Sequence, residues 1–154
     1  MSGLTIFRIE VEEASLTRSP RGLVSGPLVA HLGSEAFPGP KWTDAVVVVL
    51  GWWVVSLSSI STGSTAMTRL RFMEGPYEIE VQVKTPASLT VRFISRFSCG
   101  DSVIAEGAVA KETLLLEAIR AADRIWTECQ RRGWSSHDVK RLNDGLNKLR
   151  SNVP

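Results

Sequence analysis

The sequence predicts an α+β fold, in which an antiparallel sheet of about five strands is packed by one central Val/Trp-rich helix and a C-terminal helical hairpin. Three observations predict it. Residues 67–96 alternate apolar and polar side chains in runs joined by short turns, which is typical of antiparallel strands. The apolar run at 44–60 has helical spacing, and residues 110–149 carry amphipathic stripes.

The composition is that of an ordinary globular domain. The 154 residues are 44% hydrophobic and 22% charged, with a net charge of +2. These fractions exclude collagen-like, disordered and coiled-coil chains. A chain of this length buries enough surface for one core, so we expect residues 1–154 to form a single domain without a metal or disulfide staple.

Two strands are predicted near the N-terminus. Leu4–Glu12 alternates apolar and polar residues, and its phase slips at Phe7, which a β-bulge would explain. Residues 17–27 are rich in turn formers and predict a loop. A second short strand is expected at Leu28–Leu32.

The segment 44–60 admits two interpretations. Its valines favour a strand by propensity, and Gly51 weakens a helix. The run is too long for a typical strand, however, and its apolar residues recur at helical spacing: Val47, Leu50, Val54, Leu57 and Ile60. We therefore predict a helix, with Thr43 as its N-cap and with Trp42 packing on Val47 as a hydrophobic staple.

The runs Met67–Met73, Tyr77–Lys84 and Ser88–Arg96 predict a meander with one solvent-facing side. Opposite charges on that side can pair across strands, which explains the pattern without a ligand. The charged residues are Arg69, Arg71, Glu78, Glu80 and Arg92. After the meander we expect a turn at Cys99–Ser102 and a short strand end at Val103–Ala105.

Two helices are predicted at the C-terminal end. The first covers 110–132, is followed by Gly133, and has one apolar stripe: Leu115, Ile119, Ala122, Trp126 and Cys129. Ser135–Asp138 matches the capping-box pattern and predicts the start of the second helix. Together they predict a helical hairpin that docks on the sheet.

Motifs for catalysis, metal binding and phosphate binding are not found in the sequence. His31 and His137 lack the context of a catalytic triad, and with Cys99 and Cys129 they lack the paired spacing of a zinc site. We expect a non-enzymatic protein with no catalytic residues, no metal and no cofactor. A pocket that joined either histidine to carboxylates would favour an enzyme instead.

The sequence also bears on the cellular location of the protein and on the kinds of partner it binds. A targeting segment is not visible at the N-terminus, so we expect a cytoplasmic protein. The apolar run Ala45–Leu57 is too short to cross a membrane as a helix, so no membrane partner is expected. Residues 131–154 carry six cations and two acids, but the isoelectric point of about 8.7 lies below the range of a dedicated nucleic-acid binder.

Tryptophan is the most informative residue type. Trp42, Trp52 and Trp53 lie around the start and middle of the predicted central helix. Neighbours on a helix are about 100° apart, so Trp52 and Trp53 face different sides and at least one is exposed or covered by another element. Either these residues fill the core, or one of them anchors a protein partner, since Trp is enriched at interfaces.

Four strings carry a resemblance to a known group: Phe37-Pro-Gly-Pro-Lys-Trp-Thr-Asp44, Val48-Val-Leu-Gly-Trp-Trp53, Leu70-Arg-Phe-Met-Glu-Gly-Pro-Tyr77 and Arg131-Arg-Gly-Trp-Ser-Ser-His-Asp-Val139. With them, about residues 28–140 resemble small uncharacterised bacterial α+β proteins found beside polymorphic toxins, where the smaller partner is an immunity protein. The resemblance implies a protein that binds and neutralises a toxin encoded nearby. It carries no catalytic motif and transfers no contact residues.

We therefore expect an immunity protein that occludes a cognate toxin by stoichiometric binding. The candidate partner-binding residues are Trp42, Trp52, Trp53, Arg69, Arg71, Glu78, Glu80 and Arg92. The alternative is a non-catalytic regulatory or small-ligand-binding module, which predicts a closed apolar pocket between the long helix and the meander. An exposed edge of the meander would also allow a homodimer.

Overall fold

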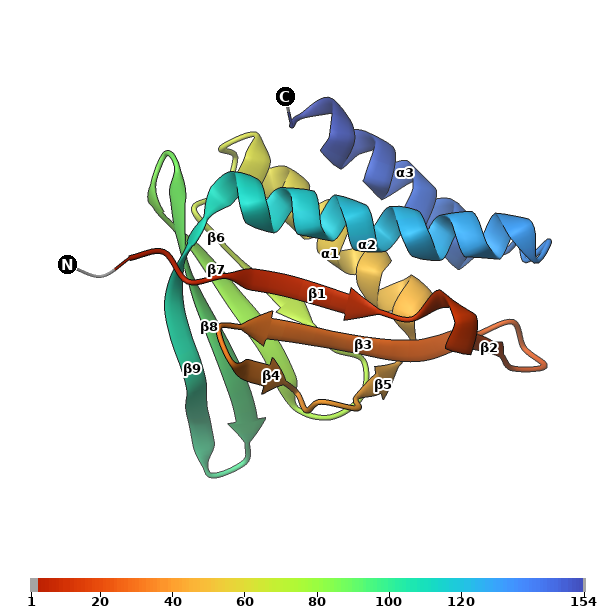
Figure 1. The fold of residues 1–154 in the computed structure, drawn as a ribbon, viewed down its shortest axis with the longest axis horizontal. Helices are drawn as coiled ribbons and strands as arrows, with labels where there is room; N and C mark the ends of the chain where they lie inside the picture. Colours follow the sequence, from red (N-terminus) through yellow and green to blue (C-terminus); the bar gives the residue numbers. More distant parts are fainter. Residues whose placement is uncertain (1–2, 154) are drawn as a thin grey trace.

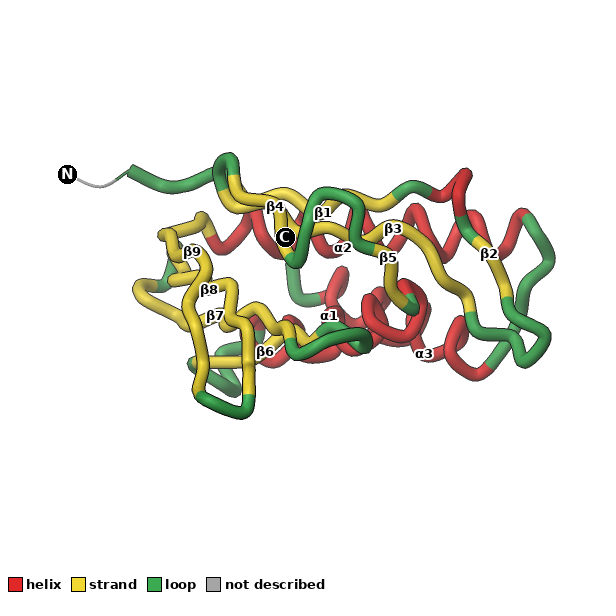
Figure 2. The backbone as a smooth tube through the Cα atoms, turned by 90° about the horizontal axis from the view of Figure 1, so that it is seen from below, coloured by secondary structure: helices red, strands yellow, loops and turns green. Residues whose placement is uncertain are grey.

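The strands of this α+β chain form two antiparallel sheets rather than the single sheet expected, and the helices α1, α2 and α3 pack with them (Figure 1). The computed structural model describes residues 3–153. The first sheet has five strands and the second has four. Figure 2 shows the second sheet at one end of the molecule and the first sheet extending along α2.

The first sheet is built around β3 (Val24–Leu32), which pairs with every other strand in it. Its partners are β1 (Phe7–Val11), β2 (Thr17–Arg18), β4 (Glu35–Phe37) and β5 (Thr43–Asp44), and a 3₁₀ turn, η1 (Glu13–Ser15), separates β1 from β2. The predicted loop at 17–27 was therefore partly wrong, because its ends belong to β2 and β3. The phase slip at Phe7 marks the start of β1 and not a bulge, since pairing with β3 begins there in regular register.

The second sheet confirms the predicted meander. Strands β6 (Met67–Arg71), β7 (Tyr77–Thr85) and β8 (Ser88–Phe97) follow one another in space and in sequence, and β9 (Gly100–Ala110) completes the sheet. The prediction missed most of β9, of which only a short end at Val103–Ala105 was expected. Nearly all of β9 is at least partly exposed, so it lacks the alternation that reveals a half-buried strand.

Helix α1 (Val46–Ser61) confirms the helical interpretation of the apolar run. Thr43 is not its N-cap, because Thr43 belongs to β5 and the helix begins after Ala45 without a side-chain cap. The Asp44 carboxylate fixes this entry: it accepts hydrogen bonds from the N–H of Ala45 at 2.7 Å, Trp42 Nε1 at 3.0 Å and the N–H of Glu74 at 3.2 Å.

Helices α2 (Lys111–Arg131) and α3 (His137–Ser151) follow each other as predicted, but only α2 packs on the first sheet. It lies along β1, whereas α3 lies mainly against α1 (Figure 1). The N-cap of α3 is Ser136, whose hydroxyl accepts a hydrogen bond from the N–H of Val139 at 3.2 Å. The buried face of α2 is also rotated from the predicted stripe, since Ile119 and Trp126 are only half-buried.

Aromatic side chains fill the core between α1 and the sheets. Phe37 stacks on Phe93 with ring centroids 4.6 Å apart, and Trp53 meets Phe72 edge to face at 5.2 Å. All four side chains are buried. Side chains therefore occupy the region where the ligand-binding alternative predicts a closed pocket. In the part of the chain that the structure describes, no helix is both long enough and apolar enough to span a membrane.

Candidate partner-binding groove

A narrow strip of α1 stays uncovered although most of this helix is buried. The strip consists of Val48, Trp52 and Val55, spaced at i, i+4 and i+7, so the three side chains share one face. Trp52 is 43% exposed and Val55 is 52% exposed, while their neighbours Trp53 and Val54 are both at 0%. The exposed tryptophan and the two valines therefore form a small apolar patch on a helix that is otherwise mostly buried.

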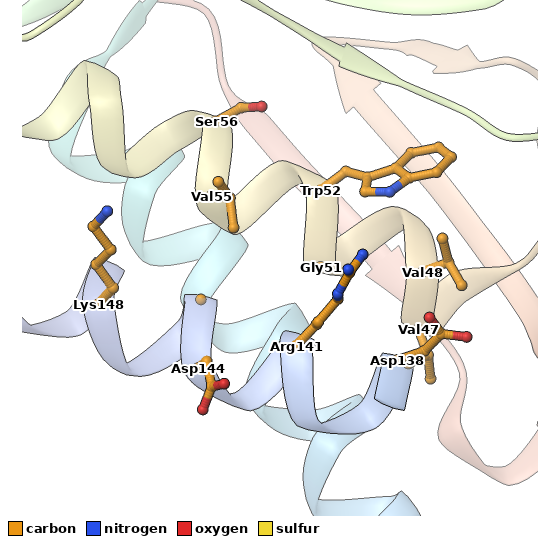
Figure 3. Close-up of a pocket in the computed structure, with 11 residues that line it drawn as sticks. Val47, Val48, Gly51, Trp52, Val55, Ser56, Asp138, Arg141, Asp144 and Lys148 are labelled. Atoms are coloured by element: carbon orange, nitrogen blue, oxygen red, sulfur yellow. The ribbon is translucent and has the colours of Figure 1, made fainter. Parts of the chain in front are cut away.

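The strip forms one wall of an open groove of about 790 Å³, and α3 forms the other wall (Figure 3). Gly51 and Gly145 lie in its lining, and a Cβ at either position would come within 4 Å of the other helix. A Cβ at Gly145 would come 2.7 Å from Val54 Cγ2, so only glycine fits this crossing without a shift. The absence of side chains at these two positions lets α1 and α3 pack closely.

Charged side chains form the α3 wall. Arg141 and Lys148 point from α3 toward α1, whereas Asp144 points away from it (Figure 3). Asp144 lies 4.0 Å from Lys140, its neighbour one turn earlier. Within residues 3–153, Arg141 and Lys148 form no ion pair, so both positive charges remain available to a ligand.

The other C-terminal cations form ion pairs with carboxylates of the same chain. Arg131 and Arg132 both pair with Glu128, and Arg150 pairs with Asp123 at 2.7 Å. The hydrogen bonds from Arg131 and Arg132 lower the pKa of Glu128 from 4.5 to about 2. Arg132 also donates a hydrogen bond to the carbonyl of Leu16, the residue after η1, and so links η1 to the end of α2. Among residues 131–153, Arg141 and Lys148 are thus the cations without an ion-pair partner in the described structure.

Of the three predicted tryptophans, only Trp52 faces the groove. Trp42 is half-buried against Tyr77, with ring centroids 5.3 Å apart, and donates its Nε1–H to Asp44. Trp53 is fully buried and donates its Nε1–H to the carbonyl of Arg71 at 2.8 Å. The structure therefore gives Trp42 and Trp53 packing positions and separates them from Trp52.

The charged face of the meander is paired within itself. Glu78 is buried and accepts hydrogen bonds from Arg69 at 3.0 Å and Arg96 at 2.5 Å, while Arg71 lies 3.7 Å away. On the same face, Glu80 pairs with Arg69 and Arg92, and Arg92 also pairs with Glu106. These cross-strand pairs are those that the alternation predicts. They leave this face less open to a charged partner than the groove.

The histidines lie apart from the groove lining. His31 Nε2 is 2.8 Å from Glu10 Oε1 across the β1–β3 pair, and His137 is exposed at the start of α3. Cys99 is exposed and Cys129 is buried, where burial raises the pKa of its thiol. Among residues 3–153, no group of three or more His, Cys, Asp or Glu side chains is placed to hold a metal ion.

A second exposed apolar region lies at the β8–β9 hairpin. Phe97, Val103 and Ile104 are 53%, 57% and 46% exposed. β9 is the edge of the four-stranded sheet, and its register with β8 shifts near Ile104. Such an irregularity weakens an edge as a template for a further strand, so this region is less suited to pairing than a flat edge would be.

No protein-family model, curated protein or solved structure matches this sequence. Function is therefore inferred from the arrangement of side chains. The sequence prediction included Trp52 but missed the other lining residues, among them Val48, Val55, Asp138, Arg141, Asp144 and Lys148. The spacing of Arg141 and Lys148, seven residues apart, places them on one face of α3, but the sequence does not reveal that this face meets the exposed strip of α1.

Proposed function

We propose that this protein is an immunity protein that neutralises a cognate toxin by direct stoichiometric binding, with the α1/α3 groove as the contact surface. The observation that carries the proposal is the exposure of Trp52 between Val48 and Val55, beside two cations without an ion-pair partner in residues 3–153. Tryptophan and arginine are the residues most enriched where interfaces gain their binding energy.

The groove also lies on a rigid support. Both walls are helices, and most other residues of α1 are buried, so Trp52 is presented by an element that the core holds in place. A preorganised anchor lowers the entropy cost of association. The paired face of the meander offers no comparable anchor, because its charges already have partners. These features favour the groove over the sheet face that the sequence predicted.

A second candidate is a non-catalytic module that binds a small ligand in the same groove. Its volume of about 790 Å³ lies within the range of ligand pockets. The groove is open and carries its charged groups on the α3 wall, which suits an extended protein surface better than an enclosed small molecule. A thermal-shift screen with metabolites tests this candidate, and a ligand that stabilises wild type but not Trp52→Ser would favour it.

The experiment that tests the proposal is co-expression with the product of the adjacent reading frame. We expect that product to stop growth alone and wild-type protein to restore growth. Trp52→Ser should weaken the rescue, while Leu116→Ser should not. Leu116 is a matched control, because it is 46% exposed on α2 and lies outside the groove lining. A neighbour that is harmless alone, or toxicity that wild type does not relieve, would contradict the proposal.

A further inference from the structure

We infer that the β6–β7 end of the meander face binds a small oxyanion of the phosphate class. A pocket of about 260 Å³ lies there, and its charged lining residues are three arginines and one glutamate: Arg69, Arg71, Arg96 and Glu78. The pocket shares no lining residue with the α1/α3 groove. The inference therefore goes beyond the proposed function and does not depend on it.

The strand register brings the arginines to one carboxylate. Arg71 of β6 lies directly opposite Glu78 of β7, and Arg69 lies two residues earlier on the same face of β6. From β8, Arg96 Nε donates to Glu78 Oε1 at 2.5 Å, and Arg69 Nη1 donates to the same oxygen at 3.0 Å. Glu78 is only 3% exposed. This buried carboxylate holds two guanidinium groups in place, so the donors are positioned before a ligand arrives.

The ion pairs satisfy the carboxylate but leave arginine donors unused. Each guanidinium has five N–H groups, and three guanidinium groups share Glu78. Arg71 is the least committed, because its Nε lies 3.7 Å from Glu78 Oε2 and its side chain donates no hydrogen bond within residues 3–153. This side chain is 70% exposed. Its planar fork is therefore free to bind an oxyanion with two parallel hydrogen bonds, as arginine binds phosphate.

The charge of the lining favours an anion. Three arginines against one glutamate leave an excess of two positive charges in the lining. Glu80 lies outside the lining, 3.5 Å from Arg69, and also pairs with another arginine. Asp101, also outside it, lies 3.4 Å from Arg96. Neither carboxylate forms an ion pair with Arg71, so the uncompensated charge is concentrated there and attracts an anion.

The β6–β7 turn limits the size of the ligand. Gly75, Pro76 and Tyr77 line the pocket beside the arginines. Gly75 has a φ of +70°, and a Cβ there would come 2.7 Å from Tyr77 Cε2, so glycine is the residue that fits this turn. The volume of about 260 Å³ lies below the usual range of ligand pockets. It therefore suits an inorganic ion or a small monoester better than a cofactor.

Titration of the full chain with inorganic phosphate, followed by ¹H–¹⁵N NMR, tests the inference. Phosphate replaces chloride at constant ionic strength, because salt alone screens exposed charges. We expect saturable shifts of the Gly75 amide and of the Arg71 Nε–H. Arg71→Gln should weaken phosphate binding about tenfold or more, since a charge-assisted contact is lost. Arg71→Lys keeps the charge without the fork and should bind with intermediate affinity.

Lys84→Gln is the matched control, because it removes one exposed positive charge from the same sheet outside the pocket lining. It should bind phosphate as wild type does. Since Arg71 is exposed, melting curves should show its variants folded.

Three results would overturn the inference: shifts that do not saturate, shifts that a parallel titration with sodium chloride reproduces, or equal phosphate binding by wild type and Arg71→Gln. Each of these would leave the proposed function standing, because growth rescue tests the α1/α3 groove. Absence of any rescue by wild type would instead refute the proposed function alone.

Discussion

Gly145 of α3 lies so close to Val54 of α1 that a Cβ at position 145 would come 2.7 Å from Val54 Cγ2. Val54 is fully buried and cannot move without disturbing the core. The opposite glycine of the crossing, Gly51, is less confined, because the nearest atoms to its Cβ would be backbone atoms of Leu142 at 3.8 Å. The two glycines therefore differ in what an added methyl group would do.

We predict opposite effects of the two alanine substitutions. Gly145→Ala should lower the free energy of unfolding by about 1–2 kcal/mol, because overpacking outweighs the gain in helix propensity. Gly51→Ala should be neutral or raise it by up to about 1 kcal/mol. Chemical denaturation of both variants and wild type measures the difference. Equal effects would mean that the helix crossing is looser than its geometry indicates.

Substitutions of the neighbouring residues Trp52 and Trp53 should separate effects on stability from effects on binding. Trp53 is fully buried and hydrogen-bonded to the carbonyl of Arg71, so Trp53→Ala should cost about 3–5 kcal/mol of unfolding free energy. Trp52→Ala should cost less than about 1 kcal/mol, because its side chain is half in solvent. Urea denaturation provides the comparison, and a large loss for Trp52→Ala would give that residue a packing role instead of a binding role.

Two side chains of α2 form hydrogen bonds with the backbone at the edge of β1. Glu117 accepts a hydrogen bond from the N–H of Ile9 at 2.9 Å, and Arg120 donates to the carbonyl of Ile9 at 2.5 Å. The pair thereby satisfies a strand edge that would otherwise be open. We expect Glu117→Ala to speed hydrogen exchange at the Ile9 amide, which NMR can follow. Arg124→Ala removes an exposed pair with Glu13 and serves as the control, with little expected change at Ile9.

Acid should weaken the fold through Glu128. Its pKa is about 2 in the folded chain against an ordinary value of 4.5, so its charged form stabilises the fold above pH 4.5. That contribution is lost as the pH falls from 4.5 toward 2, because protonation releases Arg131 and Arg132. Glu128→Gln should reduce the dependence of unfolding free energy on pH in this window. Glu35→Gln, at an exposed carboxylate without an ion pair in residues 3–153, should not.

Local patterns in the sequence predicted much of the fold. Alternation located β6, β7 and β8, and helical spacing identified α1 despite its valines. Alternation could not place β9, because the exposure of this strand removes the pattern. Local patterns also could not show that the strands divide into two sheets, because the partners of β3 depend on long-range packing. The N-cap at Thr43 was wrong because Thr43 belongs to β5 and the neighbouring Asp44 is hydrogen-bonded to Glu74, a contact between distant segments.

The candidate site was predictable only in part. Adjacent tryptophans on a helix must diverge, which indicated that one of Trp52 and Trp53 would be exposed but not which one. The sheet charges pair across strands as the alternation predicts, and their pairing makes them poor candidates for partner contacts. The groove depends on α3 meeting α1, and neither helix encodes that meeting in its own pattern.

Isothermal titration calorimetry of this protein with the purified product of the adjacent reading frame measures the affinity and stoichiometry of the proposed complex. We expect one-to-one binding that Trp52→Ser weakens about tenfold or more and Leu116→Ser leaves unchanged. Binding that is equally tight for wild type and Trp52→Ser, or the absence of binding by wild type, would contradict the proposed function.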